Sequence, residues 1–260
     1  MCLSASVGWG GENRPTDVKL VQILLGFGSD EPLPLQPAPV ADGICGPRTI
    51  AAIEMFQRHV VGMRQPDGLV DPRGRTLRSL HAEMPDSLTA KKLHATMPDA
   101  RSADIKRFLA PLLDGMRANG IASPLRIAHF LAQIGHESAD LSRTEEIGGG
   151  DAYEGRTDLG NLQPGDGERF KGRGLIQLTG RANYRRYSAA RGIDYVGEPE
   201  RLACEVAAAV DVACWYWAVR GLNALADTDD LRQITYRING GSNGLKQRFE
   251  RLRRAKWLLT

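Results

Sequence analysis

Apolar positions recur at helical spacing in two segments near the start of the chain. The first helix is expected to begin at Thr16, which can cap it, and to end at Gly26 and Gly28. Four prolines in the stretch 31–39 exclude regular helix there and predict a connecting loop. A second helix is predicted to follow, with one apolar side made of Ile50, Ile53, Phe56 and Val60.

The turn before this second helix returns later in the chain. Asp-Gly followed by Pro-Arg occurs in residues 42–48 and again in residues 67–73. One such half cannot bury its apolar face alone, so the two halves and the first helix are predicted to pack as a small three-helix module. A turn-rich helical domain that binds no ligand would show the same pattern.

The first copy of this turn carries a longer pattern. The sequence DG-x-x-GP-x-T-x-x-A-x-x-x-FQ, from Asp42 to Gln57, resembles the peptidoglycan-binding module of many cell-wall hydrolases. The resemblance covers roughly residues 12–81. It implies that this module binds the peptide stems of the wall polymer in a shallow groove.

A second and larger helical pattern begins after a stretch with little periodicity. Residues 82–99 carry Met-Pro-Asp twice and are predicted to form a linker or a short bridging helix. Ile105 and Leu112 then share one helical face, and Ser123 followed by Pro124 is a typical start for the next helix.

Two glutamates lie at the end of this next helix and beyond it. Ile127, Leu131 and Ile134 repeat at helical spacing up to Glu137, and Glu146 follows nine residues later. In one continuous helix the two carboxylates would lie on opposite faces and roughly 13 Å apart along the axis. Because hydrolysis of a glycosidic bond uses a pair of carboxyl groups across a cleft, the helix must end between them if they act together.

Other carboxylates compete for these roles. Asp140 would be a helical neighbour of Glu137 at i+3, although a solvated charge on the last turn is an equally good interpretation. The stretch 147–169, rich in Gly, Asp and Asn, contains Glu154 and Glu168. It is long enough to be a functional loop, and it is expected to flank the cleft and to move.

Uncharged polar groups follow this loop. Gln177, Thr179, Asn183 and Tyr184 supply hydrogen-bonding groups and an aromatic face of the kind that holds sugar hydroxyls. Each of these residues is more often structural when it is considered alone.

Three motifs in a fixed order resemble glycoside hydrolase family 19, a chitinase-like family that includes many phage endolysins. They are HES at 136–138, GRG-x-IQLTGR-x-NY at 172–184 and INGG at 238–241, and the resemblance covers about residues 100–260. It implies a lysozyme-like, mostly helical catalytic domain and an inverting mechanism that uses two carboxylates and neither metal nor cofactor.

The same resemblance implies roles for individual residues. Glu137 is similar to the general acid of the family, and Glu146, in TEE, to the general base. Thr179 matches the hydroxyl that helps to place the attacking water, and Arg248 matches a charged residue that supports the acid. Substrate contacts are expected from Gln177, Asn183, Tyr184 and Asn239.

Two motifs that point to other chemistry fail on their residues. His136-Glu137 opens like the zinc motif HExxH, but position 140 is aspartate, so the second imidazole is missing. Residues 240–244 fit GxSxG, but a nucleophile elbow needs a later histidine, and all five histidines precede this segment.

Composition narrows the choice of partners. The net charge of +3, a pI near 8.7 and the absence of a basic tract give no indication of nucleic-acid binding. The four cysteines have no CxxC spacing and are expected to be free or buried thiols. No run of about 18 apolar residues is present, so no membrane span is expected.

The chain ends in a basic amphipathic segment. Leu245, Phe249, Leu252 and Leu259 can share one side of a helix, with lysines and arginines on the remainder. Packing of this helix on its own domain is favoured over contact with an anionic envelope.

These observations predict a mainly α protein with a three-helix peptidoglycan-binding module (1–81), a linker (82–99) and a family 19-like catalytic domain (100–260). The expected function is that of a monomeric endolysin that cleaves β-1,4 bonds of bacterial peptidoglycan. The N-terminus lacks the features of a signal peptide, which predicts storage in a host cytoplasm and release through a holin-type lesion. A chitinase and a non-catalytic wall-binding protein are the alternatives, and a toxin delivered by a secretion machine would share these features.

Overall fold

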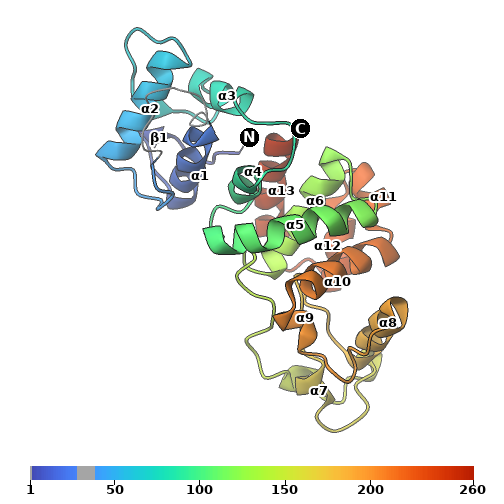
Figure 1. Ribbon diagram of the computed structural model, residues 1–260. Helices are drawn as coiled ribbons and strands as arrows, with labels where there is room; N and C mark the ends of the chain where they lie inside the picture. Colours follow the sequence, from blue (N-terminus) through green and yellow to red (C-terminus); the bar gives the residue numbers. More distant parts are fainter. Residues whose placement is uncertain (1, 28–38) are drawn as a thin grey trace. The chain divides into compact units, whose positions relative to one another are not determined.

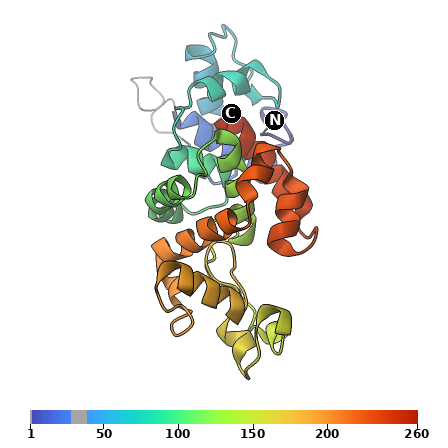
Figure 2. The ribbon, with the colours of Figure 1, turned by 90° about the vertical axis from the view of Figure 1, so that its right-hand side faces the viewer.

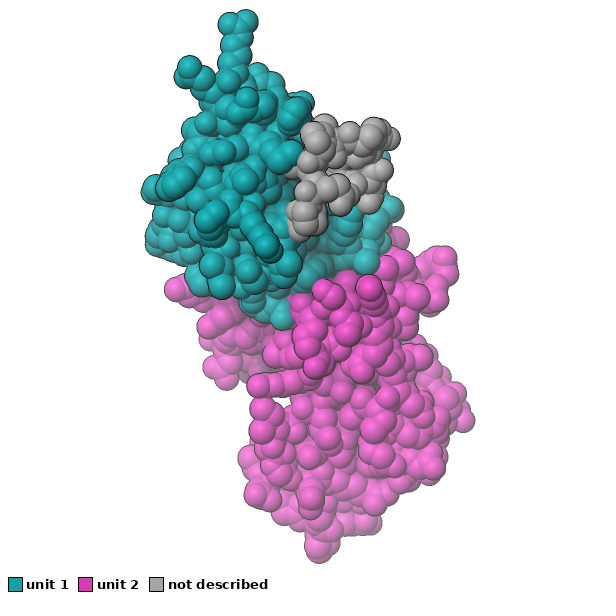
Figure 3. Space-filling model, turned by 60° about the vertical axis from the view of Figure 1, so that its left-hand side comes forward, with its two compact units in different colours: residues 1–99, 253–260 teal, residues 100–252 magenta. Residues whose placement is uncertain are grey.

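The computed structural model of the protein describes residues 2–27 and 39–260 and contains two compact units. Unit 1 comprises Met1–Asp99 and Arg253–Thr260, and unit 2 comprises Ala100–Leu252 (Figure 3). The described residues form thirteen α-helices and one two-stranded sheet. The prediction of a mainly α protein is confirmed.

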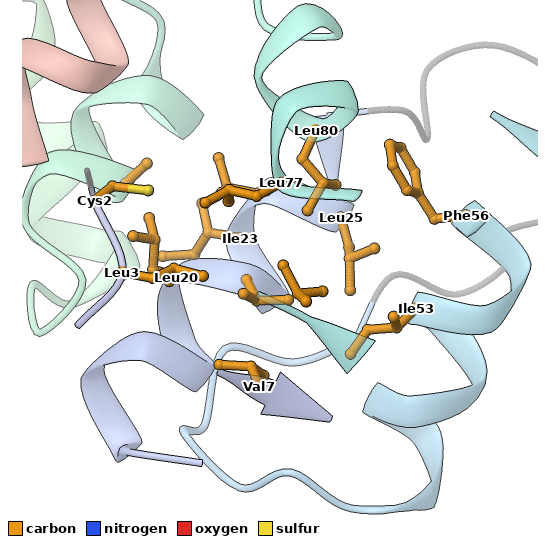
Figure 4. Packing of buried hydrophobic residues seen from close by; sticks show 14 of the residues in the cluster. Cys2, Leu3, Val7, Leu20, Ile23, Leu25, Ile53, Phe56, Leu77 and Leu80 are labelled. Atoms are coloured by element: carbon orange, nitrogen blue, oxygen red, sulfur yellow. The ribbon is translucent and has the colours of Figure 1, made fainter. Parts of the chain in front are cut away.

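The described residues of unit 1 form four complete helices, the end of the C-terminal helix and a short sheet around one apolar core. In chain order these are β1 (Val7–Gly8), α1 (Pro15–Leu25), α2 (Pro47–His59), β2 (Leu69–Val70), α3 (Arg75–Ala82) and α4 (Ala90–Thr96). The two strands pair antiparallel. Leu25 of α1, Phe56 of α2 and Leu80 of α3 belong to the same core, so the first helix packs with the two later ones as predicted (Figure 4).

The repeated turn of the sequence has a structural counterpart in unit 1. The side-chain amide of Gln22 donates to Asp42 Oδ1 at 2.8 Å, and that of Gln57 donates to Asp67 Oδ1 at 2.5 Å. Each glutamine also accepts a hydrogen bond from the glycine N–H that follows its aspartate, at 3.0 and 2.9 Å. Each half is therefore built on an equivalent buried glutamine, which pairs with a backbone N–H of the tight turn that would otherwise lack a partner.

The start of α1 differs from the prediction. Pro15 is its first residue, and Thr16 lies inside the first turn instead of capping it. Proline suits this position because the first helical N–H groups have no partner within the helix. Gly26 follows the last residue of α1, as predicted, whereas Gly28 and residues 31–38 of the predicted loop lie outside the described residues.

The stretch predicted to form a linker or a short bridging helix contains a short helix. α4 lies within residues 82–99, and Thr89 caps it by accepting a hydrogen bond from the N–H of Lys92 at 3.2 Å. Leu258, near the end of the chain, is buried in the core of unit 1. Residues 253–260 therefore belong to this compact unit, and the functional boundaries of the predicted modules stay a prediction.

Unit 2 is a helical domain with an apolar helix at its centre. Its helices are α5 (Ser102–Ala118), α6 (Pro124–Glu137), α7 (Asp166–Arg169), α8 (Arg181–Arg191), α9 (Arg201–Cys204), α10 (Val206–Val219), α11 (Leu222–Asp227), α12 (Leu231–Asn239) and the beginning of α13 (Leu245–Leu259). α10 lies between one group made of α5, α6, α11 and α12 and another made of α7, α8 and α9 (Figures 1 and 2). Trp217 of α10 is fully buried and meets Phe130 of α6 edge-on, with ring centroids 5.4 Å apart. A helix that is apolar on nearly all sides can pack against both groups at once.

α13 buries a different side from the one predicted. Phe249, which was expected on the apolar side, is 55% exposed, whereas Arg248 beside it is 1% exposed. Leu252 is buried, as predicted. Burial of a guanidinium is tolerated only where it is paired, and Arg248 is paired with Glu137.

The remaining expectations from composition concern thiols and membrane spans. All four cysteines are free, and burial raises the pKa of the Cys2 and Cys214 thiols to about 12. The prediction of free or buried thiols is confirmed. Within residues 2–27 and 39–260, no helix is both long and apolar enough to cross a membrane.

Candidate active site

α6 presents Glu137 as its last residue. Ser123 caps the start of the helix, as predicted, and the helix ends at Glu137. Ser138 closes this end because its hydroxyl donates to the carbonyl of Ile134 at 2.6 Å. The prediction that the helix ends between Glu137 and Glu146 is therefore confirmed.

The carboxylate of Glu137 is held by one buried arginine. Arg248 Nη2 donates to Glu137 Oε1, and Arg248 Nη1 donates to the amide oxygen of Gln133, one turn earlier on α6. The Glu137 side chain keeps 17% of its surface exposed, so it remains accessible from one side. A charge-assisted pair of this kind is strong, and loss of one partner from a buried pair costs about 3–5 kcal/mol.

Glu146 lies in the loop after α6 and is held by different donors. Its backbone N–H donates to the carbonyl of Gly172 at 2.9 Å. Its side chain accepts from the Tyr153 hydroxyl at 3.0 Å and from the Gly172 N–H at 3.2 Å. Burial, and then the bond to Glu146, raise the pKa of Tyr153, so the phenol stays protonated and donates. The Glu146 carboxylate therefore has a fixed orientation.

The neighbouring acid, Glu145, faces another direction. Its carboxylate accepts from Arg173 Nε at 2.9 Å and lies 3.4 Å from Lys171 Nζ. Glu145 and Arg173 form an isolated antiparallel bridge, and successive side chains in extended backbone point to opposite sides. The pair of acids in TEE is thus divided, with Glu145 in an ion pair and Glu146 beside Tyr153.

Three of the predicted polar residues lie together near Glu146. A side chain added at Gly172 would lie 3.0 Å from Gln177 Oε1 and 3.2 Å from Glu146 Oε2, so both groups approach the same glycine. The Thr179 hydroxyl donates to the Gln177 carbonyl at 2.9 Å, and the Asn183 amide donates to the Thr179 carbonyl at 2.7 Å. Gln177, Thr179 and Asn183 therefore form one hydrogen-bonded group beside Glu146.

Tyr184 and Asn239 lie in other surroundings. Tyr184 is fully buried, its hydroxyl donates to the Lys171 carbonyl at 2.9 Å, and it accepts from Arg173 Nη1 at 3.2 Å. Burial raises the pKa of Tyr184 to about 12. A contact with substrate would require the surrounding loops to move. Asn239 is exposed at the end of α12, where its amide donates to the Asn243 carbonyl at 3.4 Å.

The competing carboxylates have structural contacts. Asp140 is not a helical neighbour of Glu137, because α6 has already ended, and it is buried in an ion pair with Arg251. The interpretation of Asp140 as a solvated charge is therefore wrong. Glu154 accepts from the backbone N–H groups of Gly165 and Gly167 at 2.8 and 2.7 Å, which folds the loop onto itself. Glu168 is exposed.

His136 adds a neutral group beside the candidate acid. Burial, and then the charges of Arg248 and Arg251, lower the pKa of His136 to about 4, so the imidazole is uncharged near neutral pH. Its ring packs directly on Gly244, where a side chain would lie 2.3 Å from His136 Nε2. Gly244 also has a φ of +71°, which favours glycine.

Replacing Gly244 with alanine is expected to lower the free energy of unfolding by more than about 2 kcal/mol. The strain of a left-handed alanine contributes about 1–2 kcal/mol, and the collision with His136 adds to it. Urea denaturation measures the change. Gly192→Ala is the matched control, because Gly192 has a φ of +66° and nothing within 4 Å of the added atom. An equal loss in both variants would contradict the role assigned to the His136 contact.

Three residues of this region were not expected from the sequence. Gln133 lies four residues before Glu137 on the same helical face, so its spacing could have indicated it. Tyr153 lies in a short 3-10 helix (Asp151–Tyr153) inside the irregular loop, where no periodicity positions a side chain. Burial raises the pKa of Tyr216, and the charge of Glu137 adds to this effect, so the phenol lies within electrostatic range of the acid.

The donor sets around these acids contain no metal-binding arrangement. In the part of the chain that the structure describes, no group of three or more His, Cys, Asp or Glu side chains could hold a metal ion.

Sequence comparisons connect this region to known proteins. A family model described as chitinase class I matches residues 115–226. A glycosyl hydrolase family 19 domain-containing protein of Haemophilus influenzae is 31% identical over 160 residues, which cover 50% of this chain and 78% of that protein. Acidic endochitinase SP2 of Beta vulgaris is 37% identical over 93 residues, which cover 35% of this chain and only 32% of the plant protein.

Solved structures share the fold. Chitinase C from Streptomyces griseus has a TM-score of 0.55 at 21% identity and covers 66% of this chain and 76% of its own. A bacterial family 19 chitinase has a TM-score of 0.55 at 20% identity and covers 66% of this chain and 94% of its own.

The fold and these matches define the protein as a glycoside hydrolase. The chain belongs to glycoside hydrolase family 19. The resemblance carried by the three ordered motifs is therefore confirmed at the level of the family, whereas the roles of individual site residues stay predictions.

Proposed function

We propose that this protein hydrolyses β-1,4 glycosidic bonds of bacterial peptidoglycan, with Glu137 as general acid and Glu146 as general base. The observation that carries the proposal is that the two carboxylates have separate sets of donors. Arg248 binds Glu137, whereas Tyr153 and the Gly172 N–H bind Glu146. Two carboxyl groups held in different environments can take different roles in one reaction.

The proposed reaction inverts the configuration at the sugar carbon. Glu137 gives its proton to the leaving glycosidic oxygen while Glu146 takes a proton from a water that attacks the opposite face of the sugar. This requires the carboxyl groups to be roughly 6.5–9.5 Å apart in the working complex. Arg248 stabilises the negative charge that appears on Glu137 when its proton leaves.

The groups beside Glu146 suit the placement of that water. Tyr153 and the Gly172 N–H fix the carboxylate, and Thr179 presents a hydroxyl in the same hydrogen-bonded group as Gln177. We assign Thr179 to orientation of the water and Gln177, Asn183 and Asn239 to substrate contacts. Tyr184 supports the site through Arg173 and the Lys171 carbonyl.

The choice of peptidoglycan as substrate rests on unit 1. Its first turn carries the pattern that resembles peptidoglycan-binding modules, and both of its turns are built on the same glutamine arrangement. A wall-binding module increases the effective concentration of an attached enzyme on an insoluble polymer. We therefore propose that unit 1 binds the wall and that unit 2 cleaves it.

In this proposal the protein is a monomeric endolysin that lyses a bacterial host after release from the cytoplasm. The same proposal includes storage in the cytoplasm of the host before release, a phage origin and a monomeric state. The basic C-terminal helix offers an additional contact with an anionic envelope, since Phe249 is exposed among lysines and arginines.

Chitin is the second candidate substrate. It is favoured by the names of two relatives, acidic endochitinase SP2 of Beta vulgaris and chitinase C of Streptomyces griseus. Chitin and peptidoglycan share β-1,4-linked amino sugars, so the same pair of acids could serve for either polymer.

Digestion of purified murein sacculi and of soluble chitin oligomers, side by side, separates these candidates. We expect the protein to release soluble muropeptides from sacculi. The reducing ends of these muropeptides, identified by mass spectrometry, show which linkage is cut. Proton NMR of fresh products is expected to show the α anomer first, as inversion of a β bond requires. Cleavage of chitin oligomers with intact sacculi would make the protein a chitinase, and no cleavage of either would favour a binding protein.

A further inference from the structure

The end of α6 and the turn after it are contacted by the start of α13 and by the residue before it. Gly244 precedes the helix and packs on His136, Arg248 binds Glu137, and Arg251 Nη1 donates to Asp140 Oδ1. Arg248 and Arg251 are three positions apart and therefore lie on the same side of the helix. The same helix face therefore holds the candidate acid and the turn that follows it.

The turn after Glu137 has an unusual backbone. Ala139, Asp140 and Leu141 have φ values of 47°, 54° and 64°, so three consecutive residues other than glycine are left-handed. This conformation is unfavourable for residues with a side chain, although aspartate is among the better tolerated types. Strained segments of this kind persist only where surrounding contacts determine them.

Several contacts hold this turn. The N–H of Asp140 donates to the Gly135 carbonyl at 2.8 Å, and the N–H of Leu141 donates to the Ser138 hydroxyl at 2.9 Å. Leu141 is fully buried, and the side chain of Asp140 is only 3% exposed. The backbone bonds are local to the turn, whereas the pair with Arg251 ties the turn to another helix.

We propose that the ion pair between Asp140 and Arg251 is a positioning device for catalysis. It fixes the turn that leads the chain from Glu137 to Glu146, and so it sets the separation of the two carboxyl groups. The inference rests on the proposed function of these two acids. Neither Asp140 nor Arg251 needs to touch the substrate for this role.

A charged pair suits this task better than an apolar contact. A buried carboxylate without its partner is strongly unfavourable, so Asp140 stays where Arg251 can reach it. Arg251 lies three residues after Arg248, so one rigid helix holds the acid and the turn in register. A misplacement of about 1 Å between reacting groups costs on the order of 100-fold in rate.

Replacing Arg251 with methionine in the full chain tests the device. We expect kcat on murein to fall about 10- to 100-fold, with KM changed by less than about threefold, because the lost contact is not with substrate. Arg251→Lys is expected to restore part of kcat, since it keeps the charge. Lys246→Met is the matched control, because it removes one exposed positive charge from the same helix. An unchanged kcat in Arg251→Met, or an equal fall in Lys246→Met, would overturn the proposal.

A second variant keeps the test decisive if the first is unstable. Adding Asp140→Gly to Arg251→Met removes the buried carboxylate that has lost its arginine and places glycine where the backbone is left-handed. We expect this double variant to be more stable than Arg251→Met while kcat remains low, since stability is recovered without the tie to α13. Full recovery of kcat in the double variant would contradict a positioning role.

Hydrogen exchange gives a measure that does not depend on hydrolysis. We expect faster exchange in residues 138–146 of Arg251→Met and parent-like exchange in Lys246→Met. Glu137→Gln is expected to lower kcat by about 10²–10⁴-fold and to leave this exchange unchanged. Retained hydrolysis in Glu137→Gln would refute the roles of the two acids, whereas unchanged exchange in Arg251→Met would refute the positioning device.

Discussion

Replacing Glu146 with glutamine is expected to lower kcat on murein by about 10³-fold while the protein stays folded. A glutamine has the same shape, and its one amide oxygen can accept from the Gly172 N–H in place of Glu146 Oε2. Its NH2 group then replaces Oε1, and the Tyr153 hydroxyl can turn to accept from it, so the local structure is kept. The glutamine cannot take a proton from water. Loss of a general base typically lowers the rate by about 10²–10⁴-fold, and we expect a loss within this range. Release of soluble muropeptides under saturating substrate measures the loss, and the thermal midpoint reports the fold.

The adjacent residue provides the matched control for this prediction. Glu145→Gln changes the same functional group one residue earlier and weakens an ion pair with Arg173 whose acid is 41% exposed. Pairs this exposed contribute about 0–1 kcal/mol, so we expect kcat within about threefold of the parent. Reversed results, with Glu145→Gln inactive and Glu146→Gln active, would assign the base to the other acid of TEE.

Replacing Glu137 with glutamine is expected to cause the second large loss of activity. An amide cannot donate a proton to the leaving oxygen, so kcat is expected to fall by about 10²–10⁴-fold. The amide oxygen can still accept from Arg248, which keeps the buried guanidinium satisfied and the helix end in place. Binding of the variant to sacculi is expected to equal that of the parent, because unit 1 is unchanged.

Two measurements separate catalysis from folding in this variant. Glu250→Gln, at an exposed position of α13, is expected to keep parent activity and serves as the control. A substrate with a good leaving group needs less help from an acid, so Glu137→Gln should be relatively more active on an aryl glycoside than on murein. Full lytic activity of Glu137→Gln would refute the assignment of the acid.

The sequence predicted the path of α6 well because its signals are local. Ser123 and Pro124 mark the start, and the apolar repeat stops at Glu137, where the helix ends. The same is true of the repeated turn, where Asp-Gly and the following helix start recur in residues 42–48 and 67–73. Capping, periodicity and turn chemistry act over a few residues, so they can be read without tertiary information.

Local signals failed where long-range contacts decided the outcome. Phe249 was expected on the apolar side of α13 and is exposed. The helical pattern placed Arg248 among the charged residues, whereas the family resemblance placed it beside the acid, and it is buried. Hydrophobic periodicity treats every arginine as a polar residue. It contains no information on Glu137 and Gln133, which pair with the Arg248 guanidinium in the folded protein. The prediction that the first helix begins at Thr16 was wrong for a local reason, because Pro15 starts the helix one residue earlier.

The sequence by itself determined the family and the mainly helical fold, and it predicted Glu137 and Glu146 as the two acids of the mechanism. Only the tertiary structure decided how those acids are held, by Arg248 on one side and by Tyr153 with the Gly172 N–H on the other. It also decided that Asp140 is a buried partner of Arg251 instead of a solvated charge. The reason is that the orientation and burial of Glu137 and Asp140 depend on arginines 111 residues later in the chain, which no local pattern specifies.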